Sequence, residues 1–325
     1  MIKRTLFFLF ASALSVLGGA AQNQSAFQFL RLPVSAHAAA LGGDNVSAAD
    51  DDPTLAFHNP ALLIGMMPGT LGLQYMSYMA GSNLAGASYN LTPTDRSALA
   101  FGAEYLGFGT MRRTDVEGTD TGSFTAKDMA LAATYSYALS DMWSGGVTAR
   151  FIYSNYDLVY SLALGVDLGL NYYNADSDFS FSLVARQLGG QVKTYDGTHE
   201  PLPFNLVAGF SKGLAHAPVR FSLTLPNLTR WSSEDFYSTA ELSKKDLLVR
   251  HLVVGVDVFP TETTWIAVGF NGQLSRELAS TSGVRSLAGL TLGAGINVSR
   301  VKLGVAYGRY NVAANSLSMN FSYTL

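Results

Sequence analysis

A cluster of polar residues near the start of the chain has the side-chain types that metal sites and acid/base catalysts use. Residues 47–63 read SAADDDPTLAFHNPALL, in which Asp50, Asp51 and Asp52 precede His58. Such groups could ligate a metal ion, or Ser47 and His58 could join an Asp in a hydrolase triad. A closed site for a hard metal needs more ligands at defined spacing, and nothing in the sequence fixes a triad's geometry. We therefore predict no metal site, no catalytic residue and no cofactor.

The same stretch carries two signals for the start of a helical turn. Asp52 stands before Pro53, and Asn59 stands before Pro60. An Asp or Asn at the N-cap accepts a hydrogen bond from a free backbone N–H of the first turn, and Pro at the next position lacks an N–H that would have no partner there. The pattern predicts structural roles for these four residues.

The composition favours a membrane protein over a soluble one. Of the 325 residues, 48% are hydrophobic and 14% are charged, against about 25% charged in an average soluble protein. The formal net charge of −3 argues against nucleic acid as a partner, because phosphates require a basic surface. The absence of cysteine excludes disulfides, thiolate zinc sites and cysteine nucleophiles.

Residues 1–21 have the pattern of a secretory signal peptide. Lys3 and Arg4 precede an apolar run over 5–17, and small residues follow before Gln22. We expect cleavage there in preference to a membrane anchor. No later run reaches 18 apolar residues. An exported, apolar chain of this kind can satisfy its backbone in lipid as a closed β-barrel.

Alternating segments support the barrel. In 159–173, VYSLALGVDLGLNYY, one face carries an apolar row with Tyr160 and Tyr172 at its two ends, as a strand that crosses both bilayer interfaces would. Comparable segments recur, and they total fourteen. Their approximate spans are 69–79, 83–92, 97–108, 126–138, 142–154, 159–173, 178–187, 203–212, 217–226, 247–259, 263–275, 286–298, 300–310 and 315–325.

The connections between these segments give an independent check. Those after even strands are short, whereas the long ones, 109–125, 188–202, 227–246 and 276–285, all follow odd strands. Outer-membrane barrels have short periplasmic turns and longer outer loops. We therefore predict an all-β fold, a 14-stranded antiparallel transmembrane barrel over 69–325 in the bacterial outer membrane. The N-terminus would be periplasmic and the long loops extracellular.

The segment 22–68 precedes the first strand and is predicted to enter the barrel as a plug. It carries apolar anchors such as Phe27, Phe29 and Leu30, and the inward rows of 286–298 and 300–310 are mostly small, which leaves room in the lumen. Asp50, Asp51 and His58 would then be polar lining at the periplasmic end. His251 would stand on a strand.

Four stretches resemble the PorQ family of the type IX secretion system of Bacteroidetes. They are FLRLPVSAHAAALGGDNVSAADDDPTLAFHNPALL (29–63), residues 134–173, LVARQLGGQVK (183–193) and RHLVVGVDVFP (250–260). The Asn59-Pro60-Ala61 motif is shared more widely with FadL-like barrels and the PorV family. The resemblance covers nearly the whole chain after residue 21, and it implies a FadL-like barrel.

The resemblance also implies a function that involves no catalysed reaction. It implies an anchor for the attachment complex that processes secreted cargo at the cell surface, with the surface protein PorZ as partner, PorU and PorV reached through it, and contact with outer-membrane lipid or lipopolysaccharide. The aromatic residues Trp231, Phe236 and Tyr237 of loop 227–246 would bind the partner, or else fold over the barrel mouth. The alternative is a FadL-like transporter of hydrophobic small molecules, which requires a channel and a lateral opening.

Overall fold

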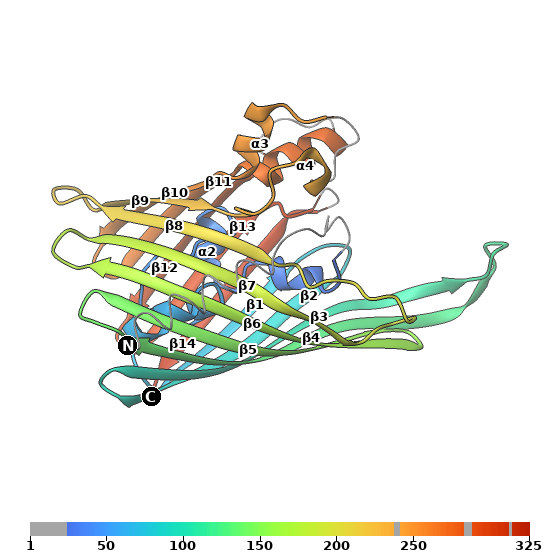
Figure 1. Ribbon diagram of the computed structural model, residues 1–325, viewed down its shortest axis with the longest axis horizontal. Helices are drawn as coiled ribbons and strands as arrows, with labels where there is room; N and C mark the ends of the chain where they lie inside the picture. The colour runs from blue at the N-terminus through green and yellow to red at the C-terminus, as the bar shows by residue number, and fades with distance from the viewer. Residues whose placement is uncertain (1–24, 237–240, 283–287, 312–313) are drawn as a thin grey trace, which may run out of the picture.

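Fourteen antiparallel strands form a closed barrel in chain order, and β1 pairs with β14 to complete it (Figure 1). The computed structural model describes residues 25–236, 241–282, 288–311 and 314–325. The predicted signal peptide, residues 1–21, lies outside the described residues. The fourteen-stranded, antiparallel, all-β prediction is confirmed.

The strands agree with the predicted spans to within a few residues for most of the barrel. Their bounds are β1 (Thr70–Ser77), β2 (Asn83–Thr94), β3 (Ser97–Thr114), β4 (Asp120–Ala138), β5 (Trp143–Tyr156), β6 (Val159–Asn174), β7 (Phe179–Lys193), β8 (Asn205–Gly213), β9 (Val219–Leu225), β10 (Val253–Thr261), β11 (Thr264–Asn271), β12 (Leu290–Val298), β13 (Val301–Gly308) and β14 (Ser316–Thr324).

The two ends of the barrel differ in their connections. Every connection after an even strand is a short turn, and we call this end the turn end. The connections after odd strands include the long ones, so the opposite end is the loop end. Along β6 the outward residues Leu164 and Val166 are exposed, whereas the inward Ala163, Gly165 and Asp167 are buried. The apolar face therefore points away from the lumen.

The prediction of a loop over residues 109–125 is wrong, because β3 and β4 extend into this segment. β3 and β4 continue as a paired hairpin from Thr110 opposite Thr125 to Thr114 opposite Asp120, and this hairpin projects beyond the rest of the barrel (Figure 1). The hairpin closes in a tight turn, because Asp115 accepts hydrogen bonds from the N–H groups of Glu117 and Thr119, at 3.0 and 2.8 Å. The alternation of inward and outward side chains therefore continues beyond the predicted strand spans 97–108 and 126–138.

Three short helices at the loop end also differ from the predicted strands and loops. They are η4 (Ser233–Asp235), α3 (Lys244–Arg250) and α4 (Gly272–Ser282). Ser243 caps α3, so β10 begins only at Val253, and His251 follows a helix where a strand was predicted. Asn271 accepts a hydrogen bond from the N–H of Leu274 at 3.0 Å and so ends β11 where α4 starts. α3 and α4 lie together beyond the ends of β9, β10 and β11 (Figure 1).

The segment 25–68 packs against the inner face of the barrel wall through α2 and η3, and we call it the plug (Figure 1). It contains η1 (Gln28–Arg31), α2 (Ala36–Ala40), η2 (Pro53–Phe57) and η3 (Pro60–Gly65). α2 packs against β11 to β14, whereas η3 packs against β3 to β6. The wall beside α2 is built from small residues. A Cβ atom at Gly293 would lie 2.7 Å from the Cβ of Ala40, so only glycine leaves room for the helix there.

Candidate functional site

Four charged side chains join the plug to the wall near the turn end. The Nδ1 of His37 lies 3.1 Å from Asp50, and its Nε2 lies 2.7 Å from Asp257 on β10. Arg220 on β9 donates to both oxygens of Asp50, at 2.6 and 2.7 Å, and to Asp257 at 2.9 Å. The ring of His37 stacks on Trp265 of β11 with centroids 4.1 Å apart. We call these residues (His37, Asp50, Arg220, Asp257) the plug latch.

The charges of the plug latch balance when His37 is protonated. Burial alone lowers the pKa of His37, but the carboxylates of Asp257 and Asp50 outweigh it and raise the pKa to about 9. Burial likewise opposes the charge of Asp50, yet Arg220 and His37 hold the pKa of that carboxyl well below its usual range. Two cations therefore face two anions, which is the condition under which buried charges are tolerated.

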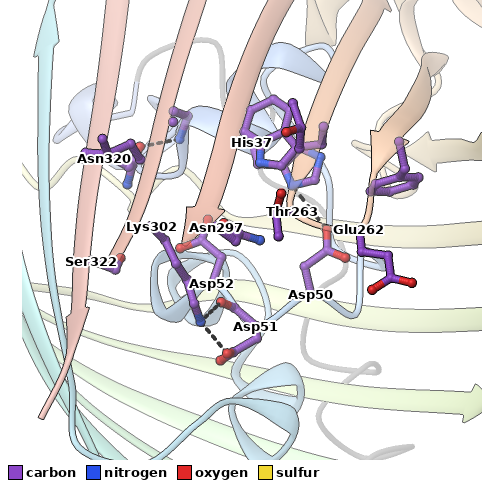
Figure 2. A pocket seen from close by; sticks show the side chains of 16 residues that line it. His37, Asp50, Asp51, Asp52, Glu262, Thr263, Asn297, Lys302, Asn320 and Ser322 are labelled. Atoms are coloured by element: carbon purple, nitrogen blue, oxygen red, sulfur yellow. Dashed lines mark hydrogen bonds and ion pairs between the residues drawn. The ribbon is translucent and has the colours of Figure 1, made fainter. Parts of the chain in front are cut away.

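Asp51 and Asp52 each have partners of their own. Asp51 forms an ion pair with Lys302 of β13, whose Nζ also donates to the backbone oxygen of Asp51 at 2.6 Å. Asp52 caps η2 by accepting from the N–H of Thr54 at 2.9 Å, and it accepts from the hydroxyl of Ser35 at 2.9 Å. Figure 2 shows the three acids on one irregular segment of the plug, with Asp50 directed at His37 and Asp51 at Lys302.

His58 does not join the acids that precede it in the sequence. It is buried, and its Nε2 accepts from the N–H of Val34 at 3.3 Å. Burial, with the positive charge of Arg186, lowers the pKa of His58 to about 4, so the ring is neutral. Ser47 bonds Ser211 at 2.7 Å and makes no triad with His58. The described part of the chain brings no group of three or more His, Cys, Asp or Glu together to hold a metal ion.

Asn59 has a structural role that the sequence pattern predicts. Its side chain accepts from the N–H of Ala61 at 3.0 Å and so caps η3, with Pro60 at the first helical position. Its amide also donates to the backbone oxygen of Val46 at 2.8 Å and to Ser182 of β7 at 3.1 Å. The Asn59 side chain therefore both begins a helical turn and attaches that turn to the barrel wall.

A second set of buried ion pairs joins the strands of the wall to each other and to the plug, and the local sequence pattern does not predict it. Arg150 on β5 donates to Asp167 at 2.7 Å, to Glu104 at 3.1 Å and to the backbone oxygen of Phe57 in the plug at 3.0 Å. Arg186 on β7 holds Asp44 of the plug through two bonds of 2.9 and 2.8 Å. The plug is thus held by charges along its length.

Cavities lie beside the plug at both ends of the barrel. The turn-end cavity, about 210 Å³, is lined by His37, Asp50, Asp51 and Lys302 among others (Figure 2). The loop-end cavity, about 250 Å³, is lined by residues of η1, β7, β8 and α4. The two cavities share no lining residue.

The wall beside the loop-end cavity is distorted in β7. Gln187 has a positive φ of 56°, and the pairing with β6 shifts register between Val166 and Leu168. Pairing with β8 ends at Arg186 and Asn205. Beyond that point, within the described residues, the isolated bridge between Gly190 and Pro201 continues the contact. Both Arg186 and Gln187 line the cavity.

The predicted partner-binding residues lie in the long loop between β9 and β10. Trp231 is 51% exposed and stacks on His251 with centroids 4.0 Å apart. Phe236 is buried, with its ring edge-on to His251 and beneath Arg250. Tyr237 lies outside the described residues. Of the two described aromatic residues, Trp231 is exposed enough to contact another molecule, whereas Phe236 packs inside the loop against His251 and Arg250.

Among the described residues, no helix is both long and apolar enough to cross a membrane.

Solved structures with the same architecture are outer-membrane transport proteins. The Ralstonia pickettii toluene transporter TbuX matches with a TM-score of 0.56 at 14% identity, over 91% of this chain and 100% of its own. The Pseudomonas putida toluene transporter TodX gives 0.54 at 12% identity, over 90% and 96%. A Pseudomonas aeruginosa FadL homologue gives 0.54 at 11% identity, over 90% and 98%.

The fold is that of the FadL-like barrels. These likenesses establish the architecture and nothing finer, since the identities are low. No protein-family model and no curated protein sequence matches the chain. The resemblance to the PorQ family therefore stays a prediction.

Proposed function

We propose that the chain is a FadL-type barrel of the bacterial outer membrane that admits small molecules when its plug moves. The turn end would face the periplasm and the loop end the cell exterior. The observation that carries the proposal is the loop-end cavity lying against the distorted part of β7, where Arg186 and Gln187 line it. A pocket beside a broken strand register is where a transport barrel would receive its ligand.

The closed lumen defines what transport requires. Because the two cavities share no lining residue, passage needs a displacement of the plug. The plug is held by ion pairs such as Arg220 with Asp50 and Arg186 with Asp44. When these ion pairs separate, their charged groups can bind water. A plug held by ion pairs can therefore be displaced without unfolding of the barrel.

Solute flux into liposomes that contain the purified chain tests this proposal. We expect small uncharged polar solutes, to which the bilayer is a barrier, to enter faster than into empty liposomes. His37→Gln with Asp50→Asn should raise the flux further, because two arms of the plug latch are removed. Asp176→Asn, in an exposed turn, serves as the control. Flux equal to that of empty liposomes, for both the wild type and the latch variant, would count against transport.

A second candidate function is the one that the PorQ resemblance implies, an anchor for a type IX attachment complex with PorZ as its direct partner. The observation that favours it is Trp231, half exposed at the loop end on a rigid stack with His251. Exposed tryptophans are common anchors of protein interfaces. Co-purification from native membranes tests it. Trp231→Ala should release the partner, whereas Trp143→Ala at the turn end should not. Equal recovery with both variants would argue against the anchor.

A further inference from the structure

The lining of the loop-end cavity combines apolar side chains with many amides. Six of its lining residues are amides, which together outnumber any other side-chain type there: Gln28, Gln187, Asn205, Asn227, Asn271 and Gln273. The volume of about 250 Å³ lies just below the ~300–1,000 Å³ of pockets for drug-sized ligands. The ligand that fits this cavity is small and forms many hydrogen bonds.

The charges of the lining cancel. Two arginines, Arg31 and Arg186, are matched by two acids, Asp44 and Glu277. Arg186 and Asp44 form a two-bond ion pair at 2.9 and 2.8 Å, so neither charge is left for a ligand. A cavity with balanced charges and many amides favours an uncharged polar ligand over an ion.

One donor and one acceptor of the lining have no partner within the described residues. Asn205 uses its oxygen to accept from the N–H of Asn227 at 2.7 Å, which leaves its NH₂ group free. Gln187 donates to the backbone oxygen of Leu30 at 3.1 Å, which leaves its own oxygen free. A donor and an acceptor in one cavity match hydroxyl groups, each of which both donates and accepts.

Two tyrosine rings, Tyr78 and Tyr310, belong to the apolar part of the lining. The other apolar residues there are Leu30, Leu32, Pro226 and Leu274. Tyr310 is held in place because its hydroxyl donates to the backbone oxygen of Ala39 at 3.0 Å and its ring packs on Gly43, where a Cβ would lie 2.6 Å away. A fixed aromatic ring can pack against the C–H face of a pyranose, while amides form hydrogen bonds with its hydroxyl groups.

We infer that the loop-end cavity binds one sugar ring, a small uncharged polyol, through Asn205 and Gln187. This inference rests on the proposed transport function for the route of the ligand, and it names the ligand's class. An apolar ligand such as toluene would leave the Asn205 NH₂ group and the Gln187 oxygen desolvated without partners, and the cost of that desolvation disfavours ligands that lack hydroxyl groups.

Binding to the purified full chain in detergent tests the inference, with methyl α-D-glucopyranoside and toluene as probes. Asn205→Asp keeps the acceptor for Asn227 and removes the free donor. The matched control Asn297→Asp makes the same change in the turn-end cavity. We expect the glycoside to bind, Asn205→Asp to weaken binding about tenfold, as the loss of one hydrogen bond would, and Asn297→Asp to leave binding unchanged. Leu274→Trp, which fills the cavity, should abolish binding. Folded barrel in each variant is checked by its heat-dependent mobility in gels.

The outcomes separate this inference from the proposed function. Glycoside binding that Asn205→Asp weakens, without flux into liposomes, supports the sugar site and overturns transport. Glycoside flux with no binding at the cavity, or binding that neither Asn205→Asp nor Leu274→Trp changes, overturns the sugar site and leaves transport standing. Toluene binding that Leu274→Trp abolishes, in the absence of glycoside binding, also overturns the sugar site.

Discussion

The Nε2 of His37 lies 2.7 Å from the Oδ1 of Asp257, and this contact ties the plug to β10 across 220 residues of sequence. The same imidazole faces Asp50 through its other nitrogen. A histidine between two carboxylates is held as a cation, so its charge is part of what keeps the plug seated. The titratable groups around it are Asp50, Arg220 and Asp257, and Trp265 covers its ring.

The attachment of the plug should weaken at alkaline pH. The pKa of His37 is raised from 6.5 to about 9, so the stabilisation is complete below pH 6.5 and is lost as the pH rises through about 9. Protection factors of the α2 amides, which correct the exchange rates for the base-catalysed rise of intrinsic exchange with pH, should fall towards the upper end of that range. His37→Gln should remove most of this pH dependence. An unchanged pH profile in His37→Gln would show that another group is responsible.

Removing Asp50 should loosen the plug more than removing an exposed acid. Asp50→Asn leaves Arg220 and His37 with Asp257 as their only carboxylate, and we expect a loss of about 1–3 kcal/mol, reduced because Asp50 is 26% exposed. Protease sensitivity of the segment 36–52 in the folded barrel reports the effect. Asp176→Asn should behave as the wild type. Equal sensitivity of the two variants would contradict a role for the plug latch.

The number and order of the strands could be predicted from the sequence because side-chain alternation is local. A strand such as 159–173 carries its inward and outward faces in its own residues. The two capping pairs, Asp52-Pro53 and Asn59-Pro60, are equally local. The errors fall where a competing local signal was overlooked. Ser243 and Asn271 begin helices inside segments that were assigned to a loop or a strand.

The plug latch could not be predicted, because its members lie far apart in the sequence. Asp50 and Arg220 are separated by 170 residues, and only barrel closure brings β9 and β10 against the plug. One signal was present. Arg150, Asp167, Arg220 and Asp257 all occupy inward positions of strands in a chain that is only 14% charged. Buried charges need partners, so inward charges on β-strands predict a charged plug without saying which residues meet.

The Arg150 cluster should be the most costly of the ion pairs to break. Arg150 is 4% exposed, and it is the shared partner of Glu104 and Asp167. Arg150→Met would leave two buried carboxylates unpaired, which should destabilise the barrel by about 3–5 kcal/mol. The temperature at which the folded form disappears in gels measures this change.

A compensated variant tests the explanation for that loss. Arg150→Met combined with Glu104→Gln and Asp167→Asn removes all three charges, so most of the stability should return. If the triple variant were as unstable as the single one, packing of the arginine stem would be the cause in place of charge.

Gly293 and Gly304 face α2, and we call them the glycine wall, which should set how closely α2 can approach the barrel. A Cβ at Gly293 would lie 2.7 Å from Ala40 and 2.6 Å from the backbone oxygen of Val305, and neither contact can be relieved by turning a flexible side chain. Gly293→Val should therefore displace α2 and cost about 1–3 kcal/mol, as overpacking does. Gly190→Val, where no atom lies within 4 Å of the added Cβ, is the matched control. Because α2 carries His37, Gly293→Val should also raise the exchange rate of the α2 amides at neutral pH. A displaced helix with normal exchange would mean that the plug latch holds without the glycine wall.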